Sequence, residues 1–185
     1  AAVIFRTPFL RDFCMALGGR AVARAAIESS LSQGNSVMIV TGGQAEMLHT
    51  RSSTTEMHLV THHLGFLRLA VRQQVPVVPI LCFAEQNVMD NIHVPWLQKR
   101  MLKWIGFPFP TLPHGRWFLP LPNRTPLTVV VGAPINPPDG LSHEDDAGIR
   151  ALSDVYFAAV KELFYEHRAA CGYPKMELIL HGRGT

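Results

Sequence analysis

The sequence predicts an α/β fold in which a partial parallel or mixed β-sheet is flanked by helices. Short β-branched runs at residues 36–40, 77–83 and 127–131 are typical of buried strands. Segments with helical periodicity lie between and after these runs, and a helix between two strands is typical of a βαβ unit. Fourteen prolines in 185 residues, several of them beside apolar runs, argue against a simple helical bundle.

Two helices are expected before the first predicted strand. Residues 8–17 have apolar side chains at helical spacing and are followed by Gly18-Gly19, a pair that stops helices. Residues 24–33 form the second expected helix, with Gly34 just beyond its end. The run at residues 36–40 then leads directly into a glycine-rich turn.

Later elements follow the same reasoning. Residues 64–74 have helical periodicity and precede the predicted strand at residues 77–83, which completes the expected βαβ unit. The strand at residues 127–131 closes at a glycine. A long amphipathic helix is expected from Ser142, with acidic residues in its first turn, and Gly172 stops it.

The composition is rich in apolar residues and poor in charge. Apolar residues make up 48% of the chain and charged residues 17%, whereas charged residues are usually about a quarter of a soluble protein. A surface that faces lipid or a partner would explain the low charge, and a large α/β core would explain part of it. The net charge of +3, without a basic stripe, argues against a nucleic-acid partner.

The length and the cysteines bound the architecture further. A chain of 185 residues fits a single domain, predicted over residues 1–185. Three cysteines without C-x-x-C spacing indicate core thiols of a reducing compartment. The longest apolar stretch, residues 75–84, is short and contains two prolines, so no bilayer-spanning helix is predicted. Because the chain opens with Ala in mid-pattern, its true N-terminus is expected upstream.

The first stretch that could carry chemistry is the turn after the predicted strand at residues 36–40. Gly42 and Gly43 let the backbone turn and present N–H groups to an anion or a developing oxyanion. Glu46 lies just past the strand end, where ligands often bind in α/β sheets. A tight turn with an exposed glutamate explains the same residues equally well.

A histidine cluster precedes the helix predicted at residues 64–74. His58 and His62 are four residues apart, which could place two metal ligands on one helical face. No third ligand is near in sequence, so the polar face of a surface helix is the simpler interpretation. Arg68 and Arg72 of the next helix could bind phosphate, although a solvated helix face is the default expectation.

Residues 95–107 have the pattern of an interfacial membrane helix. Basic side chains share one side of its helical projection, and tryptophan and aliphatic side chains share the other. An ordinary amphipathic helix packed on protein is the competing interpretation. The residues predicted to contact a membrane are Trp96, Leu97, Met101, Trp104, Ile105 and Phe107.

A proline-rich loop contains His114-Gly115-Arg116. A histidine in a loop can move protons, and the glycine allows close approach of a substrate, although loop histidines are more often merely exposed. The chain contains no G-x-S-x-G nucleophile elbow, no phosphate-binding P-loop and no G-x-G-x-x-G dinucleotide motif. It also lacks the H-x-x-x-x-D spacing that glycerol-phosphate acyltransferases use.

Several blocks, taken in order, resemble the type 2 diacylglycerol acyltransferase family, which includes monoacylglycerol and wax-alcohol acyltransferases. The likeness extends over nearly the whole chain. The blocks are Phe9 to Asp12 with Gly18-Gly19, Val40 to Leu48 (VTGGQAEML), Gly65-Phe66 with Leu69-Ala70, Val77 to Glu85 (VVPILCFAE), His114 to Arg116 (HGR), and Val130 to Ile135 (VVGAPI).

The resemblance implies an acyl-CoA-dependent O-acyltransferase that makes triacylglycerol. It implies the glycerolipid acyltransferase fold, here as a C-terminal portion that lacks the family's upstream His-Pro-His-Gly motif and therefore its catalytic histidine. We expect the 185 residues alone to be inactive and poorly soluble. The substrate-binding residues implied are Gly42, Gly43, Glu46, Arg68, Glu85, His114, Gly115 and Arg116, with the glycine-pair turn close to the His114 loop.

The resemblance also implies partners and a cellular location. Acyl-CoA is a substrate, so no metal and no bound cofactor are expected. The other expected partners are diacylglycerol or a related acceptor and a membrane surface, with oligomers possible and no nucleic acid. The implied location is the endoplasmic reticulum membrane or the lipid droplet, with the active domain on the cytosolic side.

The chain departs from the family pattern at three places. Ala84 stands where the family has the glycine of its FGE block, and Trp117 stands where HGRG ends in glycine. His62-His63 replace part of a basic run, which weakens the expectation of a CoA phosphate contact there because neutral imidazoles dominate at pH 7. Two alternatives therefore stay open: an acyltransferase for monoacylglycerol or wax alcohols, and a non-catalytic protein that binds membranes or lipid droplets.

Overall fold

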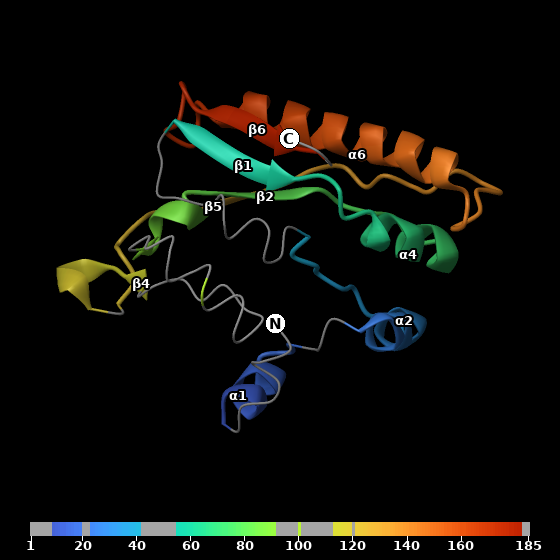
Figure 1. Cartoon of the computed structure of the whole chain (residues 1–185), viewed down its shortest axis with the longest axis horizontal. Coiled ribbons are helices and arrows are strands. Elements are labelled where there is room, and N and C mark those ends of the chain that lie inside the picture. Colours follow the sequence, from blue (N-terminus) through green and yellow to red (C-terminus); the bar gives the residue numbers. More distant parts are fainter. Residues whose placement is uncertain are drawn as a thin grey trace.

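The computed structural model describes residues 9–19, 23–41, 55–91, 100, 113–119 and 121–182. Figure 1 shows the long helix α6 lying along the strands β1, β6, β2 and β5, with α4 beside them and α2 and α1 further away. The helices are α1 (Leu10–Ala16), α2 (Arg24–Ser32), α4 (Gly65–Gln73), α6 (Asp146–His167) and the short 3₁₀ turns η2 (Glu85–Asn87) and η3 (Arg116–Phe118). The strands are β1 (Glu56–Val60), β2 (Ile80–Phe83), β3 (Asp90–Asn91), β4 (Pro113–His114), β5 (Thr128–Val131) and β6 (Glu177–His181).

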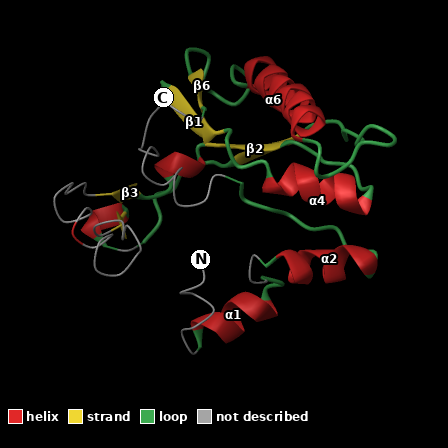
Figure 2. Ribbon diagram, turned by 45° about the vertical axis from the view of Figure 1, so that its right-hand side comes forward, coloured by secondary structure: helices red, strands yellow, loops and turns green. Residues whose placement is uncertain are grey.

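The strands pair as three separate ladders, and Figure 2 shows them with the helices around them. β1 pairs with β6 in parallel, with Glu56 opposite Glu177 and Val60 opposite His181. β2 pairs with β5 and β3 pairs with β4, both antiparallel. Parallel and antiparallel pairing occur together, so the predicted α/β fold with a partial, mixed sheet and flanking helices is confirmed.

The helices predicted at residues 8–17, 24–33, 64–74 and from Ser142 are confirmed, with small shifts at their ends, whereas the helix predicted at residues 95–107 lies almost entirely outside the described residues. Gly18 and Gly34, which follow α1 and α2, both have positive φ angles, as expected of glycines that end helices. The last helix begins at Asp146 instead of Ser142. Ser142 belongs to a turn in which its hydroxyl accepts a hydrogen bond from the Glu144 amide, and Asp145 is the N-cap, accepting from the Ala147 amide at 3.0 Å.

The predicted strand at residues 36–40 is wrong. This segment belongs to no strand ladder, and Met38 and Val40 are 82% and 79% exposed. The predicted βαβ unit is therefore wrong as well, because β2 finds its partner in the antiparallel β5. A β-branched run favours extended backbone, but a strand also needs a neighbour for its N–H and C=O groups. Conversely, β1 and β6 are strands that the sequence analysis did not predict.

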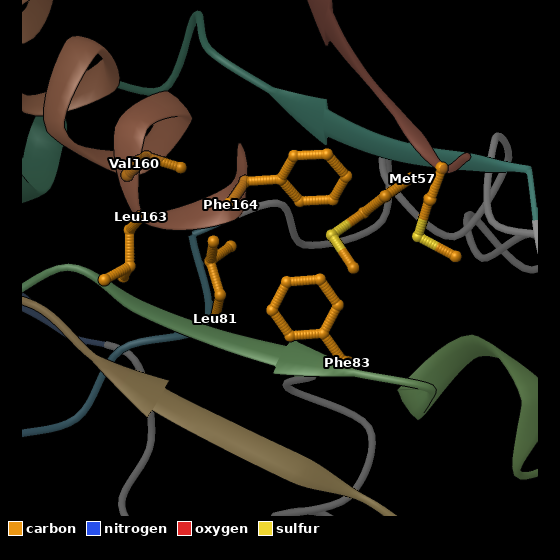
Figure 3. Packing of buried hydrophobic residues seen from close by; sticks show 7 residues of the cluster. Met57, Leu81, Phe83, Val160, Leu163 and Phe164 are labelled. Atoms are coloured by element: carbon orange, nitrogen blue, oxygen red, sulfur yellow. The ribbon is translucent and has the colours of Figure 1, made fainter. Parts of the chain in front are cut away.

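The core lies between α6 and the strands that it covers. The rings of Phe83 on β2 and Phe164 on α6 are stacked with their centroids 5.5 Å apart, and both side chains are fully buried. Figure 3 shows these rings pointing toward one another, with Met57 of β1 beside them. The remaining buried members of this cluster are Leu81, Val160, Leu163 and Met176.

A second, smaller cluster attaches α4 to α6. Leu67 and Val71 of α4 pack against Ile149 and Leu152 near the start of α6, and all four side chains are buried. In contrast, α2 has no buried residue. No helix among the described residues is both long enough and apolar enough to cross a membrane.

Candidate functional site

Strand β2 ends at a sharp change of backbone direction that presents Glu85. Phe83 is buried, and Ala84 after it has a φ of 70°, in the left-handed region, while being only 1% exposed. Glu85 then opens the turn η2 with an exposed side chain. The buried end of β2 therefore positions this carboxylate at the surface, just beyond the strand.

The chain after Glu85 pairs with the loop that contains His114. His114 of β4 lies opposite Asp90 of β3, and its Nδ1 is 3.1 Å from the Asp90 carbonyl oxygen. Further along, the Asn123 amide donates to the Val88 carbonyl at 2.7 Å. The two sequence blocks that contain Glu85 and His114 are 29 positions apart, and the β3–β4 pairing brings them into one region (Figures 1 and 2).

The loop after His114 is closed by its own backbone. The Gly115 amide donates to the Leu119 carbonyl at 2.9 Å, and the Arg116 amide donates to the Leu121 carbonyl at 3.0 Å. A Cβ atom at Gly115 would lie 1.9 Å from the Leu121 carbonyl oxygen, so only glycine fits this position. The Arg116 guanidinium lies over the Trp117 ring, with its Cζ 4.6 Å from the ring centroid.

Two departures from the family pattern have the same structural consequence. Ala84 and Trp117, which stand where the family has glycine, both have positive φ angles, 70° and 59°. This is the left-handed region, which costs a side-chain-bearing residue about 1–2 kcal/mol. The fold therefore keeps the backbone that glycine would favour at both positions, while this chain places a methyl group at one and an indole at the other.

Arg68 lies away from Glu85 and His114. Its Nη1 donates to the His143 carbonyl at 2.8 Å, and its Nη2 pairs with the Asp146 carboxylate at the start of α6. That hydrogen bond and the positive charge of Arg68 lower the pKa of Asp146. In both views α4 and the β3–β4 pair lie at opposite ends of the molecule. Arg68 thus connects α4 to α6, and its predicted role in substrate binding stays a prediction.

The predicted helical pair of His58 and His62 is wrong, because His58 lies on strand β1 and His62 in the loop after it. His58 instead meets His181, at the end of β6, with its Nδ1 2.8 Å from the His181 Nε2 and the two rings stacked. On its other side, His58 Nε2 is 3.3 Å from a Glu56 carboxylate oxygen. These three side chains form a continuous carboxylate–imidazole–imidazole chain that can hold and share a proton.

His62 and His63 follow as an exposed pair whose ring centroids are 4.1 Å apart. Desolvation, with a smaller contribution from the His62 charge, lowers the pKa of His63. His63 is therefore a weaker base than an ordinary histidine, at a place where the family pattern has a basic run. Across the part of the chain with described positions, no group of three or more His, Cys, Asp or Glu side chains could hold a metal ion.

Several predicted site residues lie outside the described residues. They are Gly42, Gly43 and Glu46 of the glycine-pair turn and the membrane-contact residues Trp96, Leu97, Met101, Trp104, Ile105 and Phe107. Thr41, which directly precedes the glycine pair, does have a described position. It lines a small hollow together with Val60 of β1, Leu81 of β2 and Val160 of α6.

An apolar hollow that the sequence analysis missed opens beside the start of α6. It has a volume of about 350 Å³ and is lined by Ile135, Asn136, Pro138, Leu141, Gly148, Ala151, Leu152 and Val155. A Cβ atom at Gly148 would lie 2.2 Å from the end of the Leu141 side chain, so the glycine leaves room for this packing. The lining suits hydrocarbon. The sequence does contain a signal for this hollow. Small and apolar residues at positions 148, 151, 152 and 155 lie on one face of the helix.

Comparison with known proteins places these features in a family context. The family model described as diacylglycerol acyltransferase matches residues 1–181. Diacylglycerol O-acyltransferase 2 of Homo sapiens is 35% identical over 191 residues, covering 95% of this chain and 48% of that protein. Diacylglycerol O-acyltransferase 1 of Saccharomyces cerevisiae is 33% identical over 190 residues, covering 96% of this chain and 45% of that protein.

A third relative is named for a different acceptor. The human 2-acylglycerol O-acyltransferase 3 is 33% identical over 191 residues, covering 94% of this chain and 54% of that protein. The chain thus spans about half the length of the curated relatives it matches. No solved structure matches it.

Proposed function

Because the chain belongs to the diacylglycerol acyltransferase family, we propose that its protein transfers an acyl group from acyl-CoA to the free hydroxyl of diacylglycerol, giving triacylglycerol. The family match over residues 1–181 is the observation that carries this proposal. The relatives named diacylglycerol O-acyltransferase support it, since they align with almost the whole chain.

The reaction sets the chemical requirements of the site. The acceptor hydroxyl oxygen attacks the thioester carbonyl, a C–O bond forms, the C–S bond breaks, and the proton lost by the hydroxyl ends on the CoA thiol. A base must take that proton as attack proceeds, and N–H donors must stabilise the oxyanion. The chain contains no His-Pro-His-Gly motif, so we assign the base to a histidine outside these residues. Acyl-CoA carries the activated acyl group, and the proposal includes no metal or cofactor.

The described residues would contribute binding and positioning groups. The β3–β4 pairing holds the segment after Glu85 against His114, so Glu85, His114 and Arg116 can line one rim of an acyl-transfer pocket. Arg116 is the guanidinium suited to a CoA phosphate, and Glu85 can accept a hydrogen bond from the acceptor alcohol. Gly115 keeps the backbone closed at this rim.

Further residues enter the proposal through the family resemblance. Gly42 and Gly43 would supply oxyanion donors, and Glu46 would share the pocket with the His114 rim. Arg68 would act on a CoA phosphate only by exchanging its contact with Asp146 for the ligand. The proposed setting is the cytosolic surface of the endoplasmic reticulum or of a lipid droplet, where both acyl substrates dissolve, with residues 96–107 in contact with the membrane and oligomers possible.

A separate part of this proposal is the identity of the alcohol that accepts the acyl group. The relative named 2-acylglycerol O-acyltransferase 3 is about as similar as the diacylglycerol enzymes, so monoacylglycerol is the second candidate acceptor. Wax alcohols complete the set of acceptors to be tested. A non-catalytic lipid-droplet protein is the alternative of a different class.

The test is acyl transfer in a yeast strain that lacks neutral lipid synthesis. The native protein that contains these residues is expressed there, and its microsomes receive labelled acyl-CoA with diacylglycerol, monoacylglycerol or a long-chain alcohol. We expect labelled triacylglycerol with diacylglycerol, and about a tenfold lower kcat/KM for Glu85→Gln and Arg116→Gln, since each removes a charged hydrogen-bonding group. Glu144→Gln, an exposed carboxylate before α6, is the matched control and should retain activity.

The possible outcomes separate the candidates. Labelled product with monoacylglycerol or alcohol alone would reassign the acceptor and contradict the diacylglycerol proposal. A membrane-bound, folded protein that transfers no acyl group to any acceptor would favour the non-catalytic alternative. Unchanged kinetics of Glu85→Gln and Arg116→Gln would remove the His114 rim from the site while leaving the reaction assignment in place.

A further inference from the structure

The loop after β4 exposes an unusual amount of apolar side chain. Trp117 and Phe118 are 73% and 80% exposed, and Leu119 and Leu121 are about half exposed. The described residues 116–119 and 121 are called the aromatic loop below. In Figure 1 this part of the chain, in yellow beside β4, lies at one edge of the molecule, far from α6. Two adjacent aromatic rings in water on a single loop are typical of a surface that binds a partner.

The aromatic loop has a strained backbone, which hydrogen bonds at its base hold in place. Trp117 and Phe118 both have left-handed φ angles, 59° and 58°, which bulky residues rarely adopt. The amide–carbonyl bonds of Gly115 and Arg116 close the loop, and the Thr125 hydroxyl donates to the Asn87 carbonyl at 3.1 Å. Such strain persists where the surroundings fix the backbone and is concentrated at functional sites.

The sequence on both sides of the aromatic loop contains basic residues and no acidic ones. From residue 91 to residue 138 there is no Asp or Glu, while the basic residues are Lys99, Arg100, Lys103, Arg116 and Arg124. All three tryptophans of the chain lie in the same stretch. The nearest preceding acid, Asp90, lies at the base of the loop, where its Oδ2 is 3.4 Å from the Asn123 side-chain amide.

Tryptophan beside arginine, without acidic residues, is the composition of membrane-interface segments. Arg116 and Arg124 flank the exposed rings, so the apolar tip and the cations can reach acyl chains and phosphate headgroups at once. A protein partner would supply acidic side chains to the arginines, but it would not account for the acid-free stretch that extends beyond the loop.

We propose that the aromatic loop inserts Trp117 and Phe118 into the surface of an anionic phospholipid bilayer, with Arg124 at the headgroups. This contact is separate from the helix that the sequence predicts at residues 96–107. It does not depend on acyl transfer, because a chain that is catalytically inactive would still bind vesicles.

Tryptophan fluorescence tests the insertion directly. In a Trp96→Phe, Trp104→Phe variant of the 185-residue chain, Trp117 is the sole tryptophan. Because these residues alone are expected to be poorly soluble, only the fraction that elutes as a monomer in size-exclusion chromatography is used. Vesicles of phosphatidylcholine and phosphatidylserine should shift its emission to the blue, and brominated acyl chains should quench it. Vesicles of phosphatidylcholine alone should bind the protein at least about fivefold more weakly. Arg124→Gln should reduce this difference in affinity between the two kinds of vesicle.

Vesicle co-sedimentation tests the side chains. The Trp117→Gly, Phe118→Asn variant should lower the partition coefficient about tenfold. Glycine and asparagine tolerate left-handed backbone, so this variant should unfold at an equal or higher urea concentration. Phe13→Asn is the matched control: it removes a phenylalanine of similar exposure from α1, 63% against 80%, and should leave partitioning within about twofold.

Three results would overturn the proposal. The first is a Trp117→Gly, Phe118→Asn variant that sediments with vesicles as strongly as the parent chain. The second is an equal loss of binding in Phe13→Asn. The third is a blue shift of Trp117 that grows with protein concentration without vesicles, which would identify a second copy of the chain as the partner.

Discussion

The two ends of the chain carry the same kind of sequence pattern and have different surroundings. The segment of α1 and its N-cap has apolar side chains at helical spacing, among them Phe9 and Phe13, yet both are exposed. α6 has the same spacing, and its Ile149 and Phe164 are fully buried. Periodicity therefore determines that each segment is a helix, whereas burial depends on whether a strand layer lies beneath it.

The N-terminal helices are only weakly attached to the region that contains the strands, α4 and α6. α2 meets α4 through Glu28, whose carboxylate is 3.6 Å from the Arg72 Nε. The α4–α6 junction, in contrast, combines a buried apolar cluster with the Arg68–Asp146 pair. The stability of the described structure should therefore come from the strands, α4 and α6, and the N-terminal helices should contribute little to it.

The largest expected effect tests this difference directly. Phe164→Ala removes a buried ring that stacks on Phe83, and we expect it to lower the free energy of unfolding by about 3–5 kcal/mol. Phe13→Ala, the same change on α1, should alter it by less than about 0.5 kcal/mol. Urea denaturation followed by circular dichroism measures both. Similar losses for the two variants would show that α1 is packed in solution and would break the comparison.

A gain of stability is expected inside the packed region. Ala84→Gly relieves a left-handed φ at a buried position, and we expect it to raise the free energy of unfolding by about 0.5–1 kcal/mol. Ala16→Gly, at the end of α1 where the backbone is helical, should show no such gain. A loss of stability in Ala84→Gly would mean that the buried methyl group contributes more packing energy than its backbone strain costs.

A similar magnitude is expected for the β1–β6 pair. The hydrogen bond between His58 and His181 joins the two strands, and the Glu56 carboxylate lies on the other side of His58. His58→Phe removes this bond, so it should lower the free energy of unfolding by about 1 kcal/mol, measured by urea denaturation. An unchanged urea midpoint in His58→Phe would show that the bond contributes no net stability.

The smallest effect is expected at the exposed Arg68–Asp146 pair. Because Arg68 lowers the pKa of Asp146, the pair contributes stability above the ordinary aspartate range, near pH 4, and loses it as the pH falls through the lowered pKa. Arg68→Gln should therefore lower the urea midpoint slightly at pH 7, and this effect should disappear as the pH falls through the lowered pKa of Asp146. Arg72→Gln, which contacts α2, should change the midpoint even less. A larger loss for Arg72→Gln would mean that α2 is held firmly.

The sequence predicted the helices and two of the strands because their patterns are local. The glycines after α1 and α2, the periodicity of residues 64–74 and the β-branched run at residues 127–131 each depend on neighbouring residues alone. Pairing is not local. Nothing around His58 indicates that its partner is His181, which lies 123 positions later and is brought beside it by parallel pairing of β1 and β6.

The same division applies to the candidate site. Glu85 and His114 were recognised as separate motifs, and only the β3–β4 pairing places the segment after Glu85 against His114. Arg68 was grouped with them because arginine suits phosphate, but the fold commits its guanidinium to Asp146 at the other end of the molecule. The exposure of Trp117 and Phe118 likewise follows from a closed loop whose backbone bonds join residues that the sequence gives no reason to pair.

The sequence by itself determined four helices, two of the strands and the family, because helical periodicity, glycine stops and ordered motifs depend on short stretches of residues. The tertiary structure alone decided which strands pair, which apolar stripes are covered and which charged groups meet. Those outcomes depend on hydrogen-bonding edges and apolar faces contributed by distant segments. The tertiary structure also decided that Ala84 and Trp117 adopt left-handed φ angles, since the surrounding contacts fix the backbone there whatever side chain is present.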